Sequence, residues 1–185
     1  ATSSGKSELA VALAQRLDGE VVSADSMQVY RGFDIGTGKI SLAERQGVQH
    51  HLLDICEATE LYSAGRFQRD ADDAILRIRA RKHLPILAGG TGLYFRAVLK
   101  ELAPTGPADR RVRADLRRRA ERRGVPAMHR ILARLDPATG ARLPENDTQR
   151  ILRALEYRIV TGKRLSDTIE NSHTAAERYD AVKIG

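Results

Sequence analysis

The sequence predicts an α/β fold in which helices flank a parallel sheet and an all-helical segment is inserted into the chain. Three observations favour this fold. Short apolar runs alternate with amphipathic helical stripes over residues 1–100, a pattern typical of parallel sheets. A loop of small residues ending in glycine and lysine directly precedes the first helical stripe. Only helical periodicity is found over residues 109–162.

The first residues fit a phosphate-binding loop (P-loop), whose pattern is G-x-x-x-x-G-K-[ST]. Residues 1–4 fill the variable positions, and Gly5, Lys6 and Ser7 follow in register. In such a loop backbone N–H groups line a diphosphate, the lysine reaches its oxygens, and the hydroxyl binds Mg²⁺. We expect the first glycine, the strand before it and a C-terminal part to lie outside this chain. The expected diphosphate-binding residues are Thr2, Ser3, Ser4, Gly5, Lys6 and Ser7, with Ser7 as the Mg²⁺ ligand.

Helices and strands alternate after this loop. The helical stripes predict helices over 6–17 and 63–82 and a further helix ending at Leu99, and the short apolar runs predict strands over 20–24, 51–55 and 85–88. Residues 32–49 are rich in glycine and polar groups and predict a surface loop. In a parallel sheet, functional groups lie at the carboxyl ends of the strands. The P-loop, Asp25 and Thr91 are all predicted at that edge, which favours one shared site.

The acidic residue after the first strand allows several roles. Asp25 fits a Mg²⁺ ligand, a general base or a helix N-cap, and its position alone does not separate these. Gln28 fits either a reader of a base edge or a solvated side chain, whereas Met27 is more typical of packing. The Gly89–Gly92 turn lets the backbone approach a ligand closely. Because the strand before it ends in glycine rather than an acidic residue, ordinary nucleotide hydrolysis is disfavoured.

Positive charge is concentrated in the second half of the chain. The net charge is +7 over 185 residues, with 30% charged and 42% apolar residues. Nucleic acid is one partner that such a surface fits, and a solvated helix face is the other interpretation. The arginines between residues 109 and 134 are Arg110, Arg111, Arg113, Arg117, Arg118, Arg119, Arg122, Arg123, Arg130 and Arg134.

The remaining features bound the class of protein. No apolar run is long enough to span a membrane, and the single cysteine, Cys56, excludes an internal disulfide and suits a reducing compartment. We therefore expect a monomeric cytoplasmic protein without membrane contact. His50 and His51 point to opposite faces of a strand and cannot easily share a metal. The acidic residues at positions 70, 72 and 73 are expected on a solvated surface.

The order of domains follows from the change of pattern along the chain. Residues 1–105 are predicted to form a P-loop core, residues 106–163 an arginine-rich helical insertion, and residues 164–185 a return to the core sheet. Residues 179–184 are expected to form the returning strand.

Together these motifs resemble the tRNA dimethylallyltransferase (tRNA isopentenyltransferase) family. The family's loop reads roughly G-P-T-A-S-G-K-[ST], and the resemblance runs in order from Ala1 to about Ser166, with small departures at Ala1 and Ser3. The further matching segments are Asp25–Arg31, Asp34–Thr37, His50–Asp54, Tyr62–Ala64, Gly89–Tyr94, Asn146–Asp147, Gln149–Ile151 and Arg153–Glu156.

The resemblance implies transfer of a dimethylallyl group from dimethylallyl diphosphate to the exocyclic amine of an adenosine beside the anticodon of tRNA. It implies Asp25 as the general base, with Thr91 and Lys6 as further catalytic residues and Mg²⁺ as the cofactor. The implied partner is the anticodon stem-loop. The implied tRNA-binding residues are Asp25, Ser26, Met27, Gln28, Thr91, Arg113, Gln149, Arg150, Ile151, Leu152 and Arg153.

Three other functions share part of this pattern. A small-molecule or nucleotide kinase has the P-loop and the parallel sheet but needs a nucleoside triphosphate. An adenylate dimethylallyltransferase performs the same chemistry on a free nucleotide, against which the arginine-rich insertion argues. A non-catalytic RNA-binding module accounts for the arginines but not for the P-loop.

Overall fold

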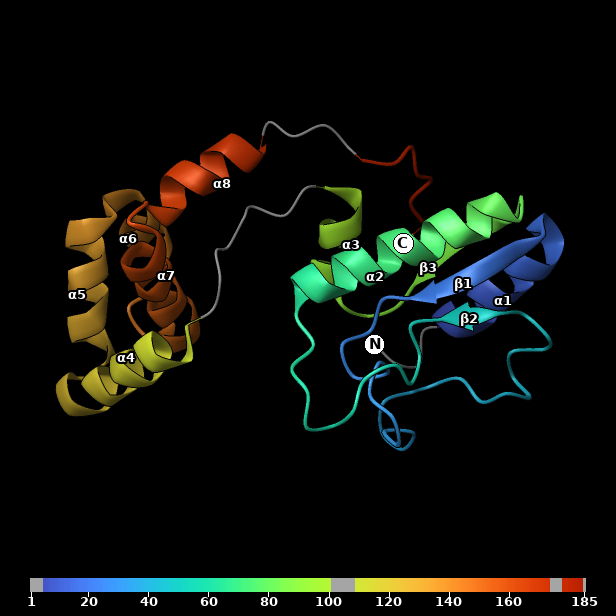
Figure 1. Cartoon of the computed structure of the whole chain (residues 1–185), viewed down its shortest axis with the longest axis horizontal. Helices are drawn as coiled ribbons and strands as arrows, with labels where there is room; N and C mark the ends of the chain where they lie inside the picture. Colours follow the sequence, from blue (N-terminus) through green and yellow to red (C-terminus); the bar gives the residue numbers. More distant parts are fainter. Residues whose placement is uncertain (1–4, 101–108, 174–177, 185) are drawn as a thin grey trace. The chain divides into compact units, whose positions relative to one another are not determined.

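The computed structural model describes residues 5–100, 109–173 and 178–184 (Figure 1). The chain divides into two compact units, which we call the core unit (residues 1–101 and 177–185) and the helical unit (residues 102–176). Within the described residues, no helix has both the length and the apolar character needed to cross a membrane.

The core unit contains a parallel three-stranded sheet in the order β2-β1-β3 (Figure 1). The strands are β1 (Gly19–Ser23), β2 (His50–His51) and β3 (Leu84–Ala88). In the register of the central strand, Val21 pairs with His50 on one side and with Ile86 on the other. The predicted parallel α/β architecture is therefore confirmed.

Helices cover both faces of this sheet. These are α1 (Lys6–Leu17) and α2 (Ala64–Ala80), and α3 (Gly92–Leu99) packs against α2. Helices α1 and α2 both pack against β1 and β3, and Ala10 and Ala14 of α1 form a buried cluster with Val21. Successive strand side chains point to opposite faces. Because Val21 and Val22 are both buried, neither face of β1 is open to solvent.

The second strand is shorter than the apolar run predicts. Strand β2 ends at His51, and the next residues include Leu52 with φ +62° and Asp54 with φ +55°. These left-handed conformations interrupt the extended backbone that a ladder requires. The chain then bonds to the segment that follows β1, because the Ile55 and Cys56 N–H groups donate to the Val29 carbonyl.

The strand predicted over residues 179–184 is absent, since residues 178–184 have no regular secondary structure. Side chains rather than a ladder attach this segment to the core unit. Arg178 donates from its backbone N to the Leu99 carbonyl at 3.0 Å and from Nη2 to Asp72 at 2.7 Å. The Tyr179 hydroxyl donates to the same carboxylate at 2.8 Å. The chain thus returns beside the point where α3 ends.

The sequence predicted that the acidic residues of α2 lie on a solvated surface, and this prediction is wrong for two of the three. Asp72 holds the returning chain, and Asp70 accepts a hydrogen bond from the Tyr62 hydroxyl at 2.7 Å. Burial and the Asp70 carboxylate both raise the pKa of Tyr62. Only Asp73 of the three is exposed.

The helical unit contains only helices within its described residues. They are α4 (Arg110–Arg123), α5 (Val125–Leu135), α6 (Pro137–Arg142), α7 (Thr148–Thr161) and α8 (Leu165–His173). Aspartates begin three of them, because the side chains of Asp109, Asp136 and Asp147 accept from backbone N–H groups of the first turn. Such caps satisfy donors that have no partner within the helix.

The last helix extends this unit beyond the boundary predicted at residue 164. Asp136 Oδ2 accepts from the Ser166 N–H at 3.0 Å, and the Tyr157 hydroxyl lies 2.7 Å from the Thr168 hydroxyl. Leu165 also packs against the helical unit's core. These contacts tie α8 to α6 and α7, whereas a return to the sheet at residue 164 would leave them unmade.

Candidate functional site

Helix α1 begins directly after a glycine in the left-handed conformation. Gly5 has φ +71°, and its carbonyl accepts from the Leu9 N–H at 2.9 Å. A side chain would be strained in this left-handed conformation, so the position requires glycine for its backbone rather than for space. Lys6 and Ser7 follow in the first turn, where the helix dipole and the backbone amides favour an anion. Thr2, Ser3 and Ser4, predicted to bind diphosphate, lie outside the described residues.

Asp25 lies just after β1 and has a fixed orientation. Its Oδ1 accepts from the Met27 N–H at 2.9 Å and from the Gln28 N–H at 3.3 Å. Among the described residues no donor bonds Oδ2. A Cβ added to Gly90 would lie 3.4 Å from that oxygen. The turn after β3 therefore keeps open the space in front of the carboxylate.

Thr91 joins the turn after β3 to the turn after β1. Its Oγ1 accepts from the Ser26 N–H at 2.9 Å, and its own N–H donates to the Ala24 carbonyl at 3.0 Å. Gly89 brings the two backbones together, because a Cβ there would lie 2.3 Å from the Ala24 oxygen. The structure thus places Asp25 and Thr91 in neighbouring turns at the carboxyl edge of the sheet, where both were expected, and Thr91 bonds Ser26 there.

The side chain of Gln28 is committed to the protein itself. Its Oε1 accepts from the Ser23 hydroxyl at 3.2 Å, and its Nε2 donates to the carbonyls of Thr37 and Gly38 at 3.1 Å each. In this arrangement the amide holds the loop after β1 and does not present itself to a base edge. Met27, by contrast, is 46% exposed.

Lys39 is a functional candidate that the sequence did not reveal. Its side chain is 4% exposed, and Nζ donates to Asp54 at 2.6 Å, to Asp34 at 2.8 Å and to the Tyr30 carbonyl at 2.9 Å. Burial opposes its charge, but the two carboxylates outweigh that effect and raise the Lys39 pKa. The lysine therefore fixes the loop, and its partner Asp54, 15 positions away, could not be recognised from spacing in the sequence.

Asp25, Gln28 and Lys39 line one cavity of about 970 Å³ in the core unit, whereas Ser26, Met27 and Thr91 are not among its lining residues. Its residues come from the start of α1, the ends of β1 and β3, and the loop from 37 to 53. His50 also faces it, and burial lowers the pKa of this histidine, aided by nearby positive charge. Residues that line the cavity and bear on its chemistry are Lys6, Ser7, Asp25, Lys39, His50 and Gly90.

The oxygen donors at this cavity fit a magnesium ion bound together with phosphates. Mg²⁺ prefers hard oxygen ligands and commonly takes only one or two from the protein. Ser7 lines the cavity and supplies a hydroxyl, and oxygens of the bound phosphates would supply further ligands. Over the described ranges no cluster of three or more His, Cys, Asp or Glu could hold a metal alone.

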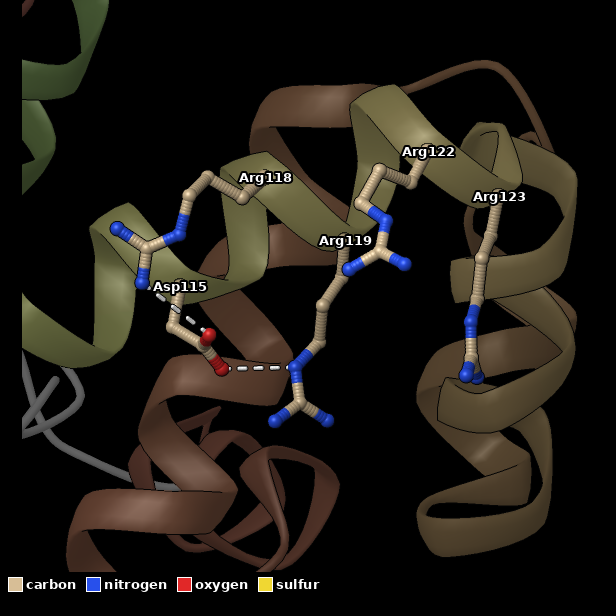
Figure 2. Close-up of a pocket in the computed structure, with 5 residues that line it drawn as sticks. All are labelled: Asp115, Arg118, Arg119, Arg122 and Arg123. Atoms are coloured by element: carbon tan, nitrogen blue, oxygen red, sulfur yellow. Dashed lines mark hydrogen bonds and ion pairs between the residues drawn. The ribbon is translucent and has the colours of Figure 1, made fainter.

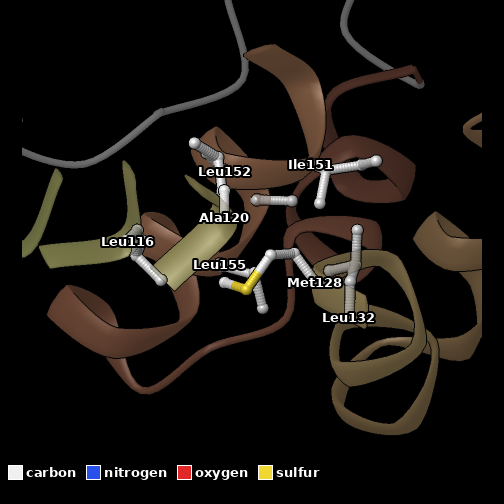
Figure 3. Close-up of a cluster of buried hydrophobic side chains, with 8 residues drawn as sticks. Leu116, Ala120, Met128, Leu132, Ile151, Leu152 and Leu155 are labelled. Atoms are coloured by element: carbon white, nitrogen blue, oxygen red, sulfur yellow. The ribbon is translucent and has the colours of Figure 1, made fainter. Parts of the chain in front are cut away.

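The tRNA-binding residues predicted on α7 fall into two groups. The side chains of Ile151 and Leu152 are 0% and 7% exposed and belong to the core of the helical unit (Figure 3). These two side chains cannot reach a ligand in this arrangement, because helical periodicity turns them inward. Gln149 and Arg150 are exposed, and Arg153 is partly exposed.

Arg113 and Arg153 meet at one buried carboxylate. Glu156 of α7 is 1% exposed and accepts from Arg113 Nη2 at 2.9 Å and from Arg153 Nη1 at 2.9 Å. Burial opposes its charge, but the two arginines lower the Glu156 pKa. The sequence indicated both arginines but gave no role to Glu156, since its contact with Arg113 spans 43 positions.

A second group of arginines lies on the outer face of α4. Figure 2 shows Arg118, Arg119, Arg122 and Arg123 together with Asp115. These five residues line a pocket of about 350 Å³. Asp115 accepts from Arg119 at 2.7 Å and from Arg118 at 3.4 Å. One carboxylate among four guanidinium groups leaves this face strongly positive.

Comparisons with known proteins place the chain in one family. Residues 28–185 match the family model described as IPP transferase. The tRNA dimethylallyltransferase of Halorhodospira halophila is 54% identical over 165 residues, which cover 89% of this chain and 53% of that protein. The chain therefore belongs to the IPP transferase family, which confirms the resemblance. It spans about half to three-fifths of the length of the relatives it matches.

Solved structures agree with this assignment. A full-length tRNA isopentenylpyrophosphate transferase from Bacillus halodurans is 45% identical, with a TM-score of 0.55, over 88% of this chain and 54% of that one. A eukaryotic dimethylallyltransferase acting on tRNA is 33% identical, with a TM-score of 0.82, over 97% of this chain and 44% of that one.

Proposed function

We propose that the protein transfers a dimethylallyl group from dimethylallyl diphosphate to the exocyclic amine (N6) of the adenosine adjacent to the anticodon in tRNA. One observation carries the proposal. In a chain of the IPP transferase family, the start of α1, the Asp25 carboxylate and the glycine turn after β3 meet around a single cavity. A diphosphate site and a proton acceptor are the two parts that this transfer requires.

The diphosphate would lie at the start of α1. Lys6 and the first amides of the helix would bind its oxygens most strongly as negative charge develops on departure. Ser7 would hold Mg²⁺ beside it, and the bound ion supplies further neutralisation of the diphosphate charge. Because the P-loop is indifferent to what the phosphates carry, the walls of the cavity must select the small apolar donor.

Asp25 would act as the general base. The adenine N6 attacks C1 of the dimethylallyl group, the C1–O bond breaks, and its electron pair leaves with the diphosphate. Asp25 Oδ2 accepts the proton lost from N6, while Oδ1 stays bonded to the backbone at 2.9 Å. That backbone contact holds the carboxylate in place throughout the transfer.

The tRNA would contact both units. We propose that the adenosine is flipped out of the anticodon loop to reach the cavity, with Ser26, Met27 and Thr91 around it and Gln28 supporting the loop behind them. Phosphates of the stem-loop would bind the helical unit through Arg113, Gln149, Arg150 and Arg153. The outer arginines of α4 would offer further phosphate contacts.

The cellular setting and assembly are further proposals. Cys56 is a buried thiol, which suits the reducing cytoplasm, and the proposed acceptor is a cytoplasmic RNA. We propose that the protein works there as a monomer. Size-exclusion chromatography with light scattering tests this assembly state.

A choice among acceptors and donors tests the reaction class. The intact protein is given labelled dimethylallyl diphosphate with either tRNA or AMP, and separately ATP with either acceptor. We expect label in tRNA and none in AMP, because the positive helical unit fits a polymer. Label in AMP alone would support the adenylate enzyme, and phosphate transfer from ATP without prenyl transfer would support a kinase.

A further inference from the structure

Glu156 occupies a place where a carboxylate is costly. It is 1% exposed at the seam between α4 and α7, beside the apolar core of the helical unit. Burying a charge is unfavourable unless it is paired, and apolar side chains at such a place often give equal or greater stability. Stability alone therefore explains poorly why a glutamate occupies this position.

The contacts of Glu156 are almost entirely with cations. Oε2 accepts from Arg113 Nε at 3.2 Å, from Arg113 Nη2 at 2.9 Å and from Arg153 Nη1 at 2.9 Å. Oε1 accepts from the Asp109 N–H at 3.0 Å, at the first turn of α4. The carboxylate thus fixes the guanidinium of Arg113 by a two-nitrogen contact and brings it beside that of Arg153.

The two arginines reach the surface although their partner does not. Their side chains are 39% and 29% exposed. One buried carboxylate thus holds two partly exposed guanidinium groups. Long side chains lose much conformational freedom on binding. Holding both guanidinium groups beforehand would remove part of that cost.

We propose that Glu156 is a positioning residue that presets Arg113 and Arg153 as a paired site for a backbone phosphate of the tRNA. This inference rests on the proposed function, because it names how the helical unit grips the same RNA. Guanidinium groups match phosphate geometry better than ammonium groups. A fixed pair would therefore set the register of the RNA on the helical unit.

Glu156→Gln in the intact protein separates positioning from simple charge. Removing a negative charge raises the net positive charge by one, so charge alone predicts equal or tighter tRNA binding. Positioning predicts the opposite: the Kd for tRNA should rise about tenfold, comparable to losing one charge-assisted hydrogen bond. The KM for dimethylallyl diphosphate should not change.

Asp136→Asn is the matched control. Asp136 is also 1% exposed in the helical unit, and its described partners are Thr139 and the Ser166 N–H rather than arginines. This variant makes the same charge change and should lower Tm while leaving the Kd for tRNA unchanged. Circular dichroism would establish a temperature at which every variant is folded.

Arg113→Lys keeps the inference testable if Glu156→Gln does not fold. It preserves charge, and Glu156 keeps Arg153 as a partner, but an ammonium cannot make the two-nitrogen contact. We expect weaker tRNA binding here too. Unchanged or tighter binding by folded Glu156→Gln, or unchanged binding by Arg113→Lys, would overturn the inference alone. Wild-type protein that fails to bind tRNA would overturn the proposed function and this inference together.

Discussion

The orientation of one carboxylate decides the proposed chemistry at the scale of single residues. Asp25 Oδ1 accepts two backbone N–H groups, which leaves Oδ2 directed to the side of Gly90. A backbone-held carboxylate of this kind suits a base that must keep one oxygen in reach of substrate. This geometry favours the general base among the roles that the sequence left open.

Asp25→Asn should leave dimethylallyl diphosphate binding nearly unchanged and reduce kcat by roughly two to four powers of ten, the usual contribution of general acid–base catalysis. An amide cannot accept the N6 proton, although it can still accept the backbone hydrogen bonds. Single-turnover transfer and donor binding measure the two quantities. Asp18→Asn, at an exposed position before β1, is the control. Loss of donor binding together with turnover would instead identify Asp25 as a metal ligand.

The adjacent glycines of the turn after β3 should respond differently to alanine. At Gly89 a Cβ would lie 2.3 Å from the Ala24 carbonyl oxygen, so Gly89→Ala should destabilise the fold by roughly 3 kcal/mol. At Gly90 it would lie 3.4 Å from Asp25 Oδ2. Gly90→Ala should keep Tm nearly unchanged and lower kcat about tenfold by displacing the reacting groups. Equal effects of the two substitutions on Tm would contradict this reading of the turn.

The sequence could indicate candidate residues that belong to short local motifs. Gly5, Lys6, Asp25 and Thr91 stand at turns whose chemistry is visible in a few consecutive positions. Lys39 and Glu156 could not be predicted, because a buried charge is recognised by partners from other elements. Gln28 shows the same difficulty, since its amide bonds to a loop about ten positions away.

At the scale of elements, Glu20 ties β1 to its neighbours at the end of the sheet away from the cavity. It is 3% exposed and accepts from Arg81 at 2.7 Å and 3.0 Å, with His51 Nε2 at 2.6 Å and His83 Nδ1 at 2.7 Å. Hydrogen bonds from Arg81 and the two histidines lower the Glu20 pKa to about 2, against the effect of burial.

Glu20→Gln should lower the free energy of unfolding at neutral pH by about 2 to 4 kcal/mol, reduced somewhat because Arg81 is partly exposed. The folded pKa lies below the usual 4.5, so this stabilisation is complete above pH 4.5 and is lost as pH falls toward 2. His51 and His83, together with Asp18 near His83, also face this cluster. Denaturant unfolding at several pH values should show the wild type and the variant converging below pH 4.5. A difference in unfolding free energy that stays constant with pH would contradict the assignment of this stabilisation to ionised Glu20.

The outer arginines of α4 should govern the salt dependence of tRNA binding. Arg122→Gln combined with Arg123→Gln should reduce the slope of log Kd against log salt by about two, one for each phosphate contact. Arg16→Gln combined with Arg77→Gln makes the same charge change on the core unit. An identical slope in both double variants would show that the α4 arginines do not contact RNA phosphates and only form a solvated helix face.

Helices were easier to predict than strands because their evidence is local. The stripe over residues 6–17 coincides with α1, and the Asp109 and Asp147 caps lie at the starts of α4 and α7. A strand depends on a partner elsewhere in the chain. The apolar alternation at 179–184 therefore resembled a strand, although the segment is attached through Arg178 and Tyr179.

At the scale of the whole molecule, the helical unit interrupts the core unit between two adjacent points. The Arg178 N–H donates to the Leu99 carbonyl at 3.0 Å, so the chain leaves and re-enters the core unit at one place. Each unit also has its own buried core. Under the proposed function, donor chemistry would belong to the core unit and most of the RNA affinity to the helical unit.

Product analysis tests the central claim most directly. The intact protein is incubated with tRNA, labelled dimethylallyl diphosphate and Mg²⁺, and the digested nucleosides are identified by mass spectrometry while diphosphate release is counted. We predict one dimethylallyl group on N6 of the adenosine adjacent to the anticodon for each diphosphate released. ATP hydrolysis stimulated by tRNA, with no prenylated adenosine formed, would contradict the account.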